Sequence, residues 1–184
     1  MFSISIKEKL ELKLLLHNDA EIFFNSIQRN RTYLEEFMPR MGENHSISDT
    51  KTVINIFINQ LIQNNGFRVG IYYDDNFIGI IGLKYIDWIN KKTEIMYWID
   101  KDFIGKGITT ECVKKILDIS FNYYNLNKVI LIAADSNIAS QKIAEKCGFK
   151  IEGILREDEL LKNGYVNSLQ YSIIKSEFQK ENLL

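Results

Sequence analysis

Two glycines stand where the sequence is best suited to hold a ligand. Gly105 and Gly107, in "DFIGKGITT", come directly before an apolar pattern with helical spacing that begins at Ile108. Glycine lets a backbone approach another molecule closely, and the start of a helix offers unpaired N–H groups with a partial positive charge. The pattern is consistent with a site for a phosphate-bearing ligand, and equally consistent with a strand-to-helix turn that binds nothing.

Two common phosphate-binding motifs are excluded by the residues around these glycines. A dinucleotide fingerprint requires a third glycine three residues after the second, and that position holds Thr110. A Walker loop requires Ser or Thr directly after Gly-Lys, whereas Lys106 is followed by Gly107. What remains is a Gly-x-Gly turn whose amides can surround one pyrophosphate, with Lys106 as a mobile counter-charge.

Composition indicates an ordinary soluble protein. The chain has 184 residues, 46% hydrophobic and 26% charged, and a net charge of −1, so no strong field favours nucleic acid or a membrane surface. We find no signal peptide and no apolar run long enough to span a bilayer. Cys112 and Cys147 lack Cys-x-x-Cys spacing, which predicts buried reduced thiols in a cytoplasmic protein. His17 and His45 form no metal-ligand spacing with them, so we expect no metal.

The elements that must position the glycine turn follow from the hydrophobic periodicity. Seven strands are expected, at residues 10–15, 67–73, 77–86, 93–99, 128–134, 149–161 and 165–174. Helices are expected at 18–30, 31–40, 48–65, 108–124 and 136–147, with Pro39 ending the second. Tight turns are expected at 74–76, near Asn90 and at Asn163-Gly164. This order predicts a mixed α/β (α+β) fold, with a mostly antiparallel central sheet of about seven strands, helices on both faces, and a single domain over residues 1–184.

Two longer stretches together carry a family resemblance. "YWIDKDFIGKGITTECV" and "NIASQKIAEKCGFKIEGILRE" resemble the GNAT superfamily of acetyl-CoA-dependent N-acetyltransferases, and most of all its branch of ribosomal-protein N-terminal acetyltransferases, RimJ and RimL. The likeness runs from "LELKLL" to the last strand. It implies the GNAT acyl-CoA N-acyltransferase fold, acetyl-CoA as cosubstrate without a metal, and an amine acceptor. It leaves open whether the chain is a monomer or a homodimer.

The resemblance also implies which residues hold coenzyme A. The loop 103–109 would surround the pyrophosphate through its backbone amides, although Ile104 stands where the family usually has Gln or Arg. Backbone at the end of the strand 93–99 would pair with the pantetheine and polarise the thioester carbonyl. Asn137 would meet the pantetheine arm near the thiol, and its plainer reading is a helix N-cap. The expected coenzyme-binding residues are Tyr97, Trp98, Ile99, Ile104, Gly105, Lys106, Gly107, Ile108, Thr109 and Asn137.

The expected acid comes from the same resemblance. Many family members carry a tyrosine that protonates the leaving thiolate, and the matching position is Ala144. In the RimJ/RimL-like branch a serine takes that role, and the matching residue is Ser140. The alternative reading of Ser140 is a small residue that allows close packing between helix and sheet.

The expected base is a carboxylate of "REDELL". The resemblance proposes a glutamate as base in this strand, and counting along the strand from Gly153 matches it to Glu159. Glu157 is the second choice, because alternate residues of a strand lie on the same face. Such a run of acidic residues is also typical of a solvated strand face. Asn167 stands where family members usually have Asp, so no carboxylate acts there.

The acceptor is the least constrained part. At pH 7 an α-amine is neutral far more often than a lysine side chain. A protein N-terminus is therefore the favoured acceptor, and it needs only a modest base. A small amine such as a polyamine or aminoglycoside is the runner-up, and a CoA-binding module with negligible turnover is the third reading. Residues expected on the acceptor side, from the early helices and the last hairpin, are Tyr33, Glu35, Glu36, Phe37, Met38, Asp87, Trp88 and Glu159.

Overall fold

A mixed eight-stranded sheet forms the centre of the chain in the computed structural model, which describes residues 2–38 and 46–181. The strands are β1 (Ser3–Lys7), β2 (Leu10–Lys13), β3 (Phe67–Tyr73), β4 (Asn76–Asp87), β5 (Lys92–Ile99), β6 (Lys128–Ala134), β7 (Lys150–Leu161) and β8 (Gly164–Ile174). Their spatial order is β1-β2-β3-β4-β5-β6-β8-β7, and every neighbouring pair is antiparallel except β5 with β6. The predicted fold class is confirmed.

The expected number of strands was one too low, because β1 was missed. Ser3–Lys7 alternates small polar residues with isoleucine, and most of the strand is exposed at the sheet edge, so it gives little hydrophobic signal. It folds back on β2 through a turn in which Lys9 adopts a φ of 66°.

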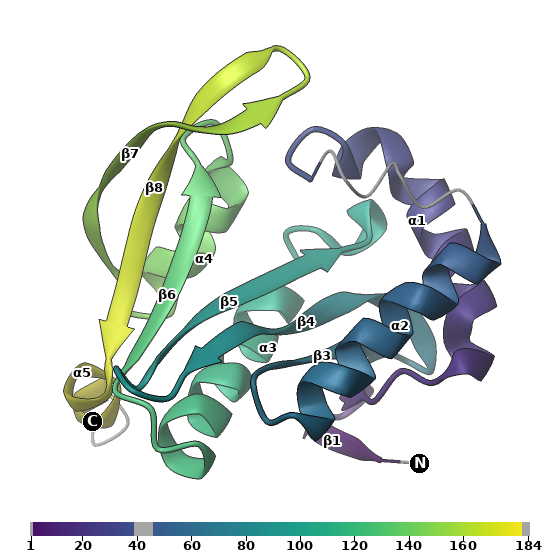
Figure 1. Cartoon of the computed structure of the whole chain (residues 1–184), viewed down its shortest axis with the longest axis horizontal. Helices are drawn as coiled ribbons and strands as arrows, with labels where there is room; N and C mark the ends of the chain where they lie inside the picture. Colours follow the sequence, from purple (N-terminus) through teal and green to yellow (C-terminus); the bar gives the residue numbers. More distant parts are fainter. Residues whose placement is uncertain (1, 39–45, 182–184) are drawn as a thin grey trace.

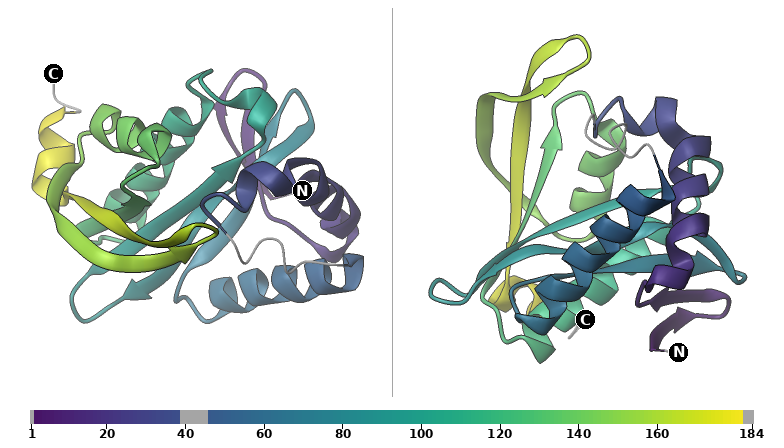
Figure 2. Two further views of the ribbon diagram at one scale, coloured as in Figure 1. Left: turned by 90° about the horizontal axis from the view of Figure 1, so that it is seen from above. Right: turned by 45° about the vertical axis from the view of Figure 1, so that its right-hand side comes forward.

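Helices cover both faces of the sheet, as Figures 1 and 2 show. On one face lie α1 (Ala20–Leu34) and α2 (Ile47–Ile62). On the other lie α3 (Ile108–Asp118), which continues into a π-helical turn (Ile119–Tyr123), and α4 (Ile138–Lys146). A short α5 (Lys175–Glu181) follows β8.

The helix expected at 31–40 is confirmed as helical only at 31–34, and it is not a separate element. Residues 31–34 belong to α1, which runs unbroken from Ala20 to Leu34. No Gly or Pro lies between Ala20 and Leu34, and the Asn30 side chain donates to the Ser26 carbonyl at 2.9 Å within the helix. Pro39 and His45 lie outside the described residues.

The alternation of side chains along β5 divides it between two cores. Ile95, Tyr97 and Ile99 belong to the core under α3 and α4, whereas Met96 and Trp98 belong to the aromatic core under α1 and α2. In that second core the Trp98 ring lies 6.3 Å from the Phe23 ring, centroid to centroid. Consecutive β5 residues therefore serve opposite faces of the sheet.

Candidate active site

The central sheet opens between β5 and β6. These parallel strands pair only over 92–94 and 128–130, with Glu94 opposite Ile130 as the last pair. Beyond that point β5 pairs only with β4, and β6 only with β8. Figure 1 shows the two strands diverging from their common end. One edge of each strand is therefore free of strand partners inside the opening.

The end of β5 directs main-chain polar groups into this opening. The Asp100 amide donates to the Ile78 carbonyl of β4 at 2.6 Å. Successive residues of a strand direct their N–H and C=O groups to opposite edges. The backbone groups of Trp98 therefore also face β4, and those of Tyr97 and Ile99 face the opening. Two of the three β5 residues expected to hold coenzyme A are thus suitably placed, while Trp98 directs both backbone and indole elsewhere.

The glycine turn at the end of the opening has the geometry of an anion cradle. Gly105 and Gly107 have φ angles of 78° and 77°, and a Cβ at either would meet no atom within 4 Å. Within the described part of the chain, the amides of Gly105, Lys106 and Gly107 have no hydrogen-bond partner, and the α3 helix begins at Ile108. The amides of Ile108 and Thr109, in the first helical turn, extend this donor set.

One member of the expected pyrophosphate loop is less available than the others. The Ile104 amide donates to the Lys101 carbonyl at 3.3 Å, so it is already satisfied. Lys106 Nζ lies 4.8 Å from the centre of the Phe103 ring, a cation–π contact that leaves the ammonium exposed at the turn. The cradle therefore consists mainly of backbone amides, with Lys106 as a nearby cation.

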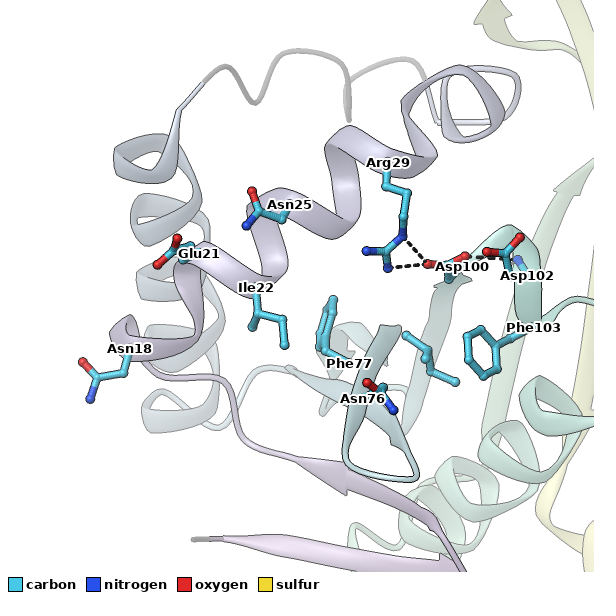
Figure 3. Close-up of a pocket in the computed structure, with 11 residues that line it drawn as sticks. Asn18, Glu21, Ile22, Asn25, Arg29, Asn76, Phe77, Asp100, Asp102 and Phe103 are labelled. Carbon is cyan, nitrogen blue, oxygen red and sulfur yellow. Dashed lines mark hydrogen bonds and ion pairs between the residues drawn. The ribbon is translucent and has the colours of Figure 1, made fainter.

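Asp100 ties the stem of this loop to α1. The Arg29 guanidinium donates to its carboxylate through Nε at 3.0 Å and through a terminal nitrogen at 2.5 Å, as Figure 3 shows. Asn30 accepts from the Lys101 amide at 3.0 Å. Burial alone raises the pKa of the Asp100 carboxyl, but interactions with Asn30 and Arg29 outweigh it and hold the pKa below its usual value. The loop thus starts from a fixed, ionised anchor.

A cavity of about 670 Å³ lies on the α1 side of this stem. Figure 3 shows that Arg29 and Asn25 of α1 line it together with Asn76, Asp102 and Phe103. It is separate from the opening between β5 and β6, because its walls come from α1, the start of β4 and the loop after β5.

The N-terminus of α4 forms one flank of the opening. Asn137 caps the helix, its side-chain oxygen accepting from the Ser140 amide at 3.1 Å. Ser140 is half-buried and lies close to the Tyr97 hydroxyl of β5. The cap reading of Asn137 is confirmed, and Ser140 faces the strand expected to hold the thioester.

Glu159 lies near Glu94, the last β5 residue that pairs with β6, on the face of the sheet opposite α4. It is half-buried, and it is near Glu94 and Lys84, which form an ion pair. Glu94 is 8% exposed and belongs to the β5 side that faces α1 and α2. Burial raises the pKa of Glu159, an effect that Lys84 opposes and that Asp158 and Glu94 strengthen.

Glu157 does not share this environment. The β7–β8 register shifts between Leu155 and Glu159, and Glu157 sits in that bulge with a φ of 51° and an exposed side chain. The Asn167 amide oxygen accepts from the Glu157 amide at 3.0 Å, so Asn167 stabilises the bulge. The bulge breaks the simple parity argument that paired Glu157 with Glu159.

Comparison with known proteins agrees with this geometry. A family model described as an acetyltransferase (GNAT) domain matches residues 9–150. The chain belongs to the GNAT acetyltransferase family. It is therefore an acyltransferase of the N-acetyltransferase class.

Relatives of this GNAT acetyltransferase cover nearly all of it. It is 36% identical over 184 residues to the putative ribosomal N-acetyltransferase YdaF of Bacillus subtilis, covering 98% of this chain and 100% of the relative. It is 27% identical to the ribosomal-protein-serine acetyltransferase of Escherichia coli K12, covering 89% and 91%. A solved structure of RimL, the ribosomal L7/L12 alpha-N-protein acetyltransferase in complex with coenzyme A, matches at a TM-score of 0.91 with 20% identity, covering 94% and 98%.

Two residues expected on the acceptor side of this GNAT enzyme lie elsewhere. Asp87 and Trp88 are at the β4–β5 turn, where Asp87 pairs with Lys92 and the Trp88 indole donates to the Asn64 carbonyl at 2.7 Å. Because β5 and β6 are paired at Lys92, this is the closed end of the sheet. The assignment of Asp87 and Trp88 to the acceptor side was wrong.

Other functional candidates were missed in the sequence. Glu94 and Lys84 are near Glu159, and Asp100 anchors the glycine loop, yet all lie on or beside strands whose sequence gives no sign of this proximity. A buried acid within an apolar strand, as at Glu94 in "TEIMYWI", is the one signal that could have indicated a polar site.

The described residues offer no metal-binding group of three or more His, Cys, Asp or Glu side chains. None of the helices within 2–38 and 46–181 has the length and apolar character of a bilayer-crossing segment. Cys112 and Cys147 are both buried thiols, as predicted, and neither is in a disulfide within the described residues.

Proposed function

We propose that this chain transfers an acetyl group from acetyl-CoA to the N-terminal α-amine of a ribosomal protein, by direct attack in a ternary complex. The observation that carries the proposal is the opening between β5 and β6. It ends in a turn with unpartnered amides, and it is flanked by Ser140 on one face of the sheet and Glu159 on the other.

The opening fits coenzyme A in both of its parts. Open space and free donors at 105–107 suit a pyrophosphate at the start of α3. The backbone groups of Tyr97 and Ile99 suit the amides of a pantetheine arm, which can pair with them like a further strand. The residues that would hold the coenzyme are therefore Tyr97, Ile99, Gly105, Lys106, Gly107, Ile108 and Thr109.

The two proton transfers take place on opposite faces of the sheet. An amine that enters from the α1 and α2 side meets Glu159, whose raised pKa suits a carboxylate that must accept a proton. Its nitrogen attacks the thioester carbonyl carbon, whose oxygen is stabilised by main-chain donors in the opening. As the C–S bond breaks, Ser140 donates its hydroxyl proton to the sulfur from the α4 side.

The surroundings of Glu159 suit a cationic acceptor. Two acidic residues, Asp158 and Glu94, are near it. Lys84 is also near, and it pairs with Glu94. An α-amine with an ordinary pKa near 8 is neutral roughly a tenth of the time at pH 7, whereas lysine is neutral less than about one time in a thousand. One half-buried carboxylate is thus a sufficient base for an α-amine. The names of the two curated relatives point to a ribosomal protein as its source.

Thiol release from acetyl-CoA with a panel of amines tests the proposal. Peptides with the N-terminal sequences of ribosomal proteins are the first acceptors, compared with the same peptides blocked at the α-amine but containing lysine. Spermidine and an aminoglycoside complete the panel. We expect turnover with free α-amines only, and mass spectrometry should place the acetyl group on the first residue.

Two outcomes would overturn the proposal. Turnover confined to spermidine or the aminoglycoside would assign the enzyme to small amines. The second outcome is that CoA binds in calorimetry, but acetyl-CoA releases no thiol with any acceptor or with an extract supplied with labelled acetyl-CoA. That outcome would leave only a CoA-binding module.

A further inference from the structure

The Tyr97 hydroxyl is a buried polar group that the transfer steps above leave unused. Its oxygen is inaccessible to solvent and has no hydrogen-bond partner within the described residues. A buried hydroxyl without a partner destabilises a fold, and phenylalanine would fill the same space without that cost. Its presence therefore needs an explanation beyond packing.

Tyr97 lies along the face of α4 that carries Ser140. Ser140, Ala144 and Cys147 share that face because they are four and seven residues apart on the helix. Ala144 and Cys147 are buried in the core against which Tyr97 packs. The small side chain of Ala144 leaves room for a ring between β5 and α4.

The hydroxyl of Tyr97 is within reach of Ser140. Burial raises the pKa of the Tyr97 hydroxyl, and the nearby Ser140 side chain opposes that shift. The two hydroxyls do not meet hydrogen-bond geometry, since the Tyr97 oxygen has no partner within the described residues. Rotation of the Ser140 side chain between staggered positions changes where its oxygen lies relative to the Tyr97 hydroxyl.

We propose that Tyr97 is a positioning residue, whose hydroxyl donates a hydrogen bond to Ser140 Oγ and aims the Ser140 proton at the departing sulfur. The inference rests on the proposed function of this site. The raised pKa keeps Tyr97 protonated at neutral pH, so that it acts as a donor and retains its own proton.

The step balances without a further reactant. The acceptor nitrogen forms a bond to the acetyl carbon, the C–S bond breaks, and its electron pair remains on sulfur, which takes the Ser140 proton. Glu159 receives the proton lost by the amine and releases it to solvent. Ser140 recovers a proton from solvent, and the net products are the amide and the free thiol.

Tyr97→Phe tests the proposal, because it removes the hydroxyl and retains the ring. We expect turnover with saturating substrates to fall about tenfold, while the Kd for CoA changes less than about twofold. The melting temperature should be unchanged or higher, because the variant no longer buries an unpartnered hydroxyl. Tyr72→Phe, on β3 away from the opening, is the matched control and should retain full turnover.

The double variant with Ser140→Ala shows whether Tyr97 acts through Ser140. If it does, Tyr97→Phe lowers turnover no further once Ser140 is alanine. Full turnover in Tyr97→Phe, losses that multiply in the double variant, or a loss confined to CoA affinity would each overturn the inference. If the unaltered chain released no thiol with any amine, the proposed function itself would fail, and the two failures are thus distinguishable.

Discussion

At the scale of single residues, Glu159 is where activity and stability are opposed. Its pKa is raised in the folded protein, so the native state holds its proton more tightly than the unfolded chain does. Stability therefore falls as pH rises from the ordinary glutamate pKa through the raised one. The proposed base must be ionised to work, so its ionisation at neutral pH comes at some cost to the fold.

Glu159→Gln should separate these two effects. We expect turnover at pH 7 to fall about 100-fold, because the amine loses its proton acceptor. Chemical unfolding at pH 7 should show a variant at least as stable as the parent, and the difference should disappear near pH 4, where Glu159 is protonated. Glu157→Gln, on the exposed bulge, should change neither quantity. Equal losses of turnover in the two variants would remove Glu159 as the base.

The sequence predicted single residues well where a motif fixes local geometry. Gly105, Gly107 and Asn137 have the turn and cap conformations expected of them, because these depend on neighbours along the chain. Residues whose role depends on distant partners were placed less well. Asp87 and Trp88 lie at the closed end of the sheet, since nothing in a strand sequence states which of its ends will separate from the neighbouring strand.

At the scale of elements, the glycine turn and helix α3 form one unit. Gly107 caps α3 with a φ of 77°, and nothing lies within 4 Å of the position where a Cβ would stand. An alanine there would fit sterically, but it would pay the strain of a left-handed backbone and extend into the space that a phosphate needs.

Gly107→Ala should therefore affect binding more than folding. We expect a stability loss of about 1 kcal/mol from the backbone strain and a CoA affinity at least about tenfold weaker, both measured by calorimetry and chemical unfolding. Gly148→Ala is the control, because Gly148 after α4 has the same φ of 77°. It should lose stability without losing CoA affinity. A similar loss of affinity in both variants would indicate general damage to the fold.

Elements were predictable from sequence where their periodicity is strong. The strands from 67–73 onward and the helices α2, α3 and α4 match the apolar patterns that predicted them. The two wrong predictions concern segments without such a pattern. The strand β1 is mostly exposed at the sheet edge, and α1 continues through polar residues near Asn30 that include no helix breaker.

At the scale of the whole molecule, the two parts of the sheet are joined weakly at its centre. Between β5 and β6 the register covers only 92–94 with 128–130, whereas β4 with β5 and β6 with β8 pair along most of their length. A ligand in the opening would restore the missing connection, since pantetheine can pair with the free edge of β5. Coenzyme binding should therefore stabilise the sheet as a whole as well as the loop that holds the phosphates.

Hydrogen exchange with and without CoA tests this connection. At 100 times its Kd, CoA should add about 2.7 kcal/mol of stability, which raises the melting temperature by about 5–10 °C for a chain of this size. Protection should increase at the end of β5, around 97–99, and at the glycine loop. ADP, which has a pyrophosphate but no pantetheine, should protect the loop alone. Equal protection of β5 by ADP would show that the phosphates act at a distance, and that the arm does not bridge the opening.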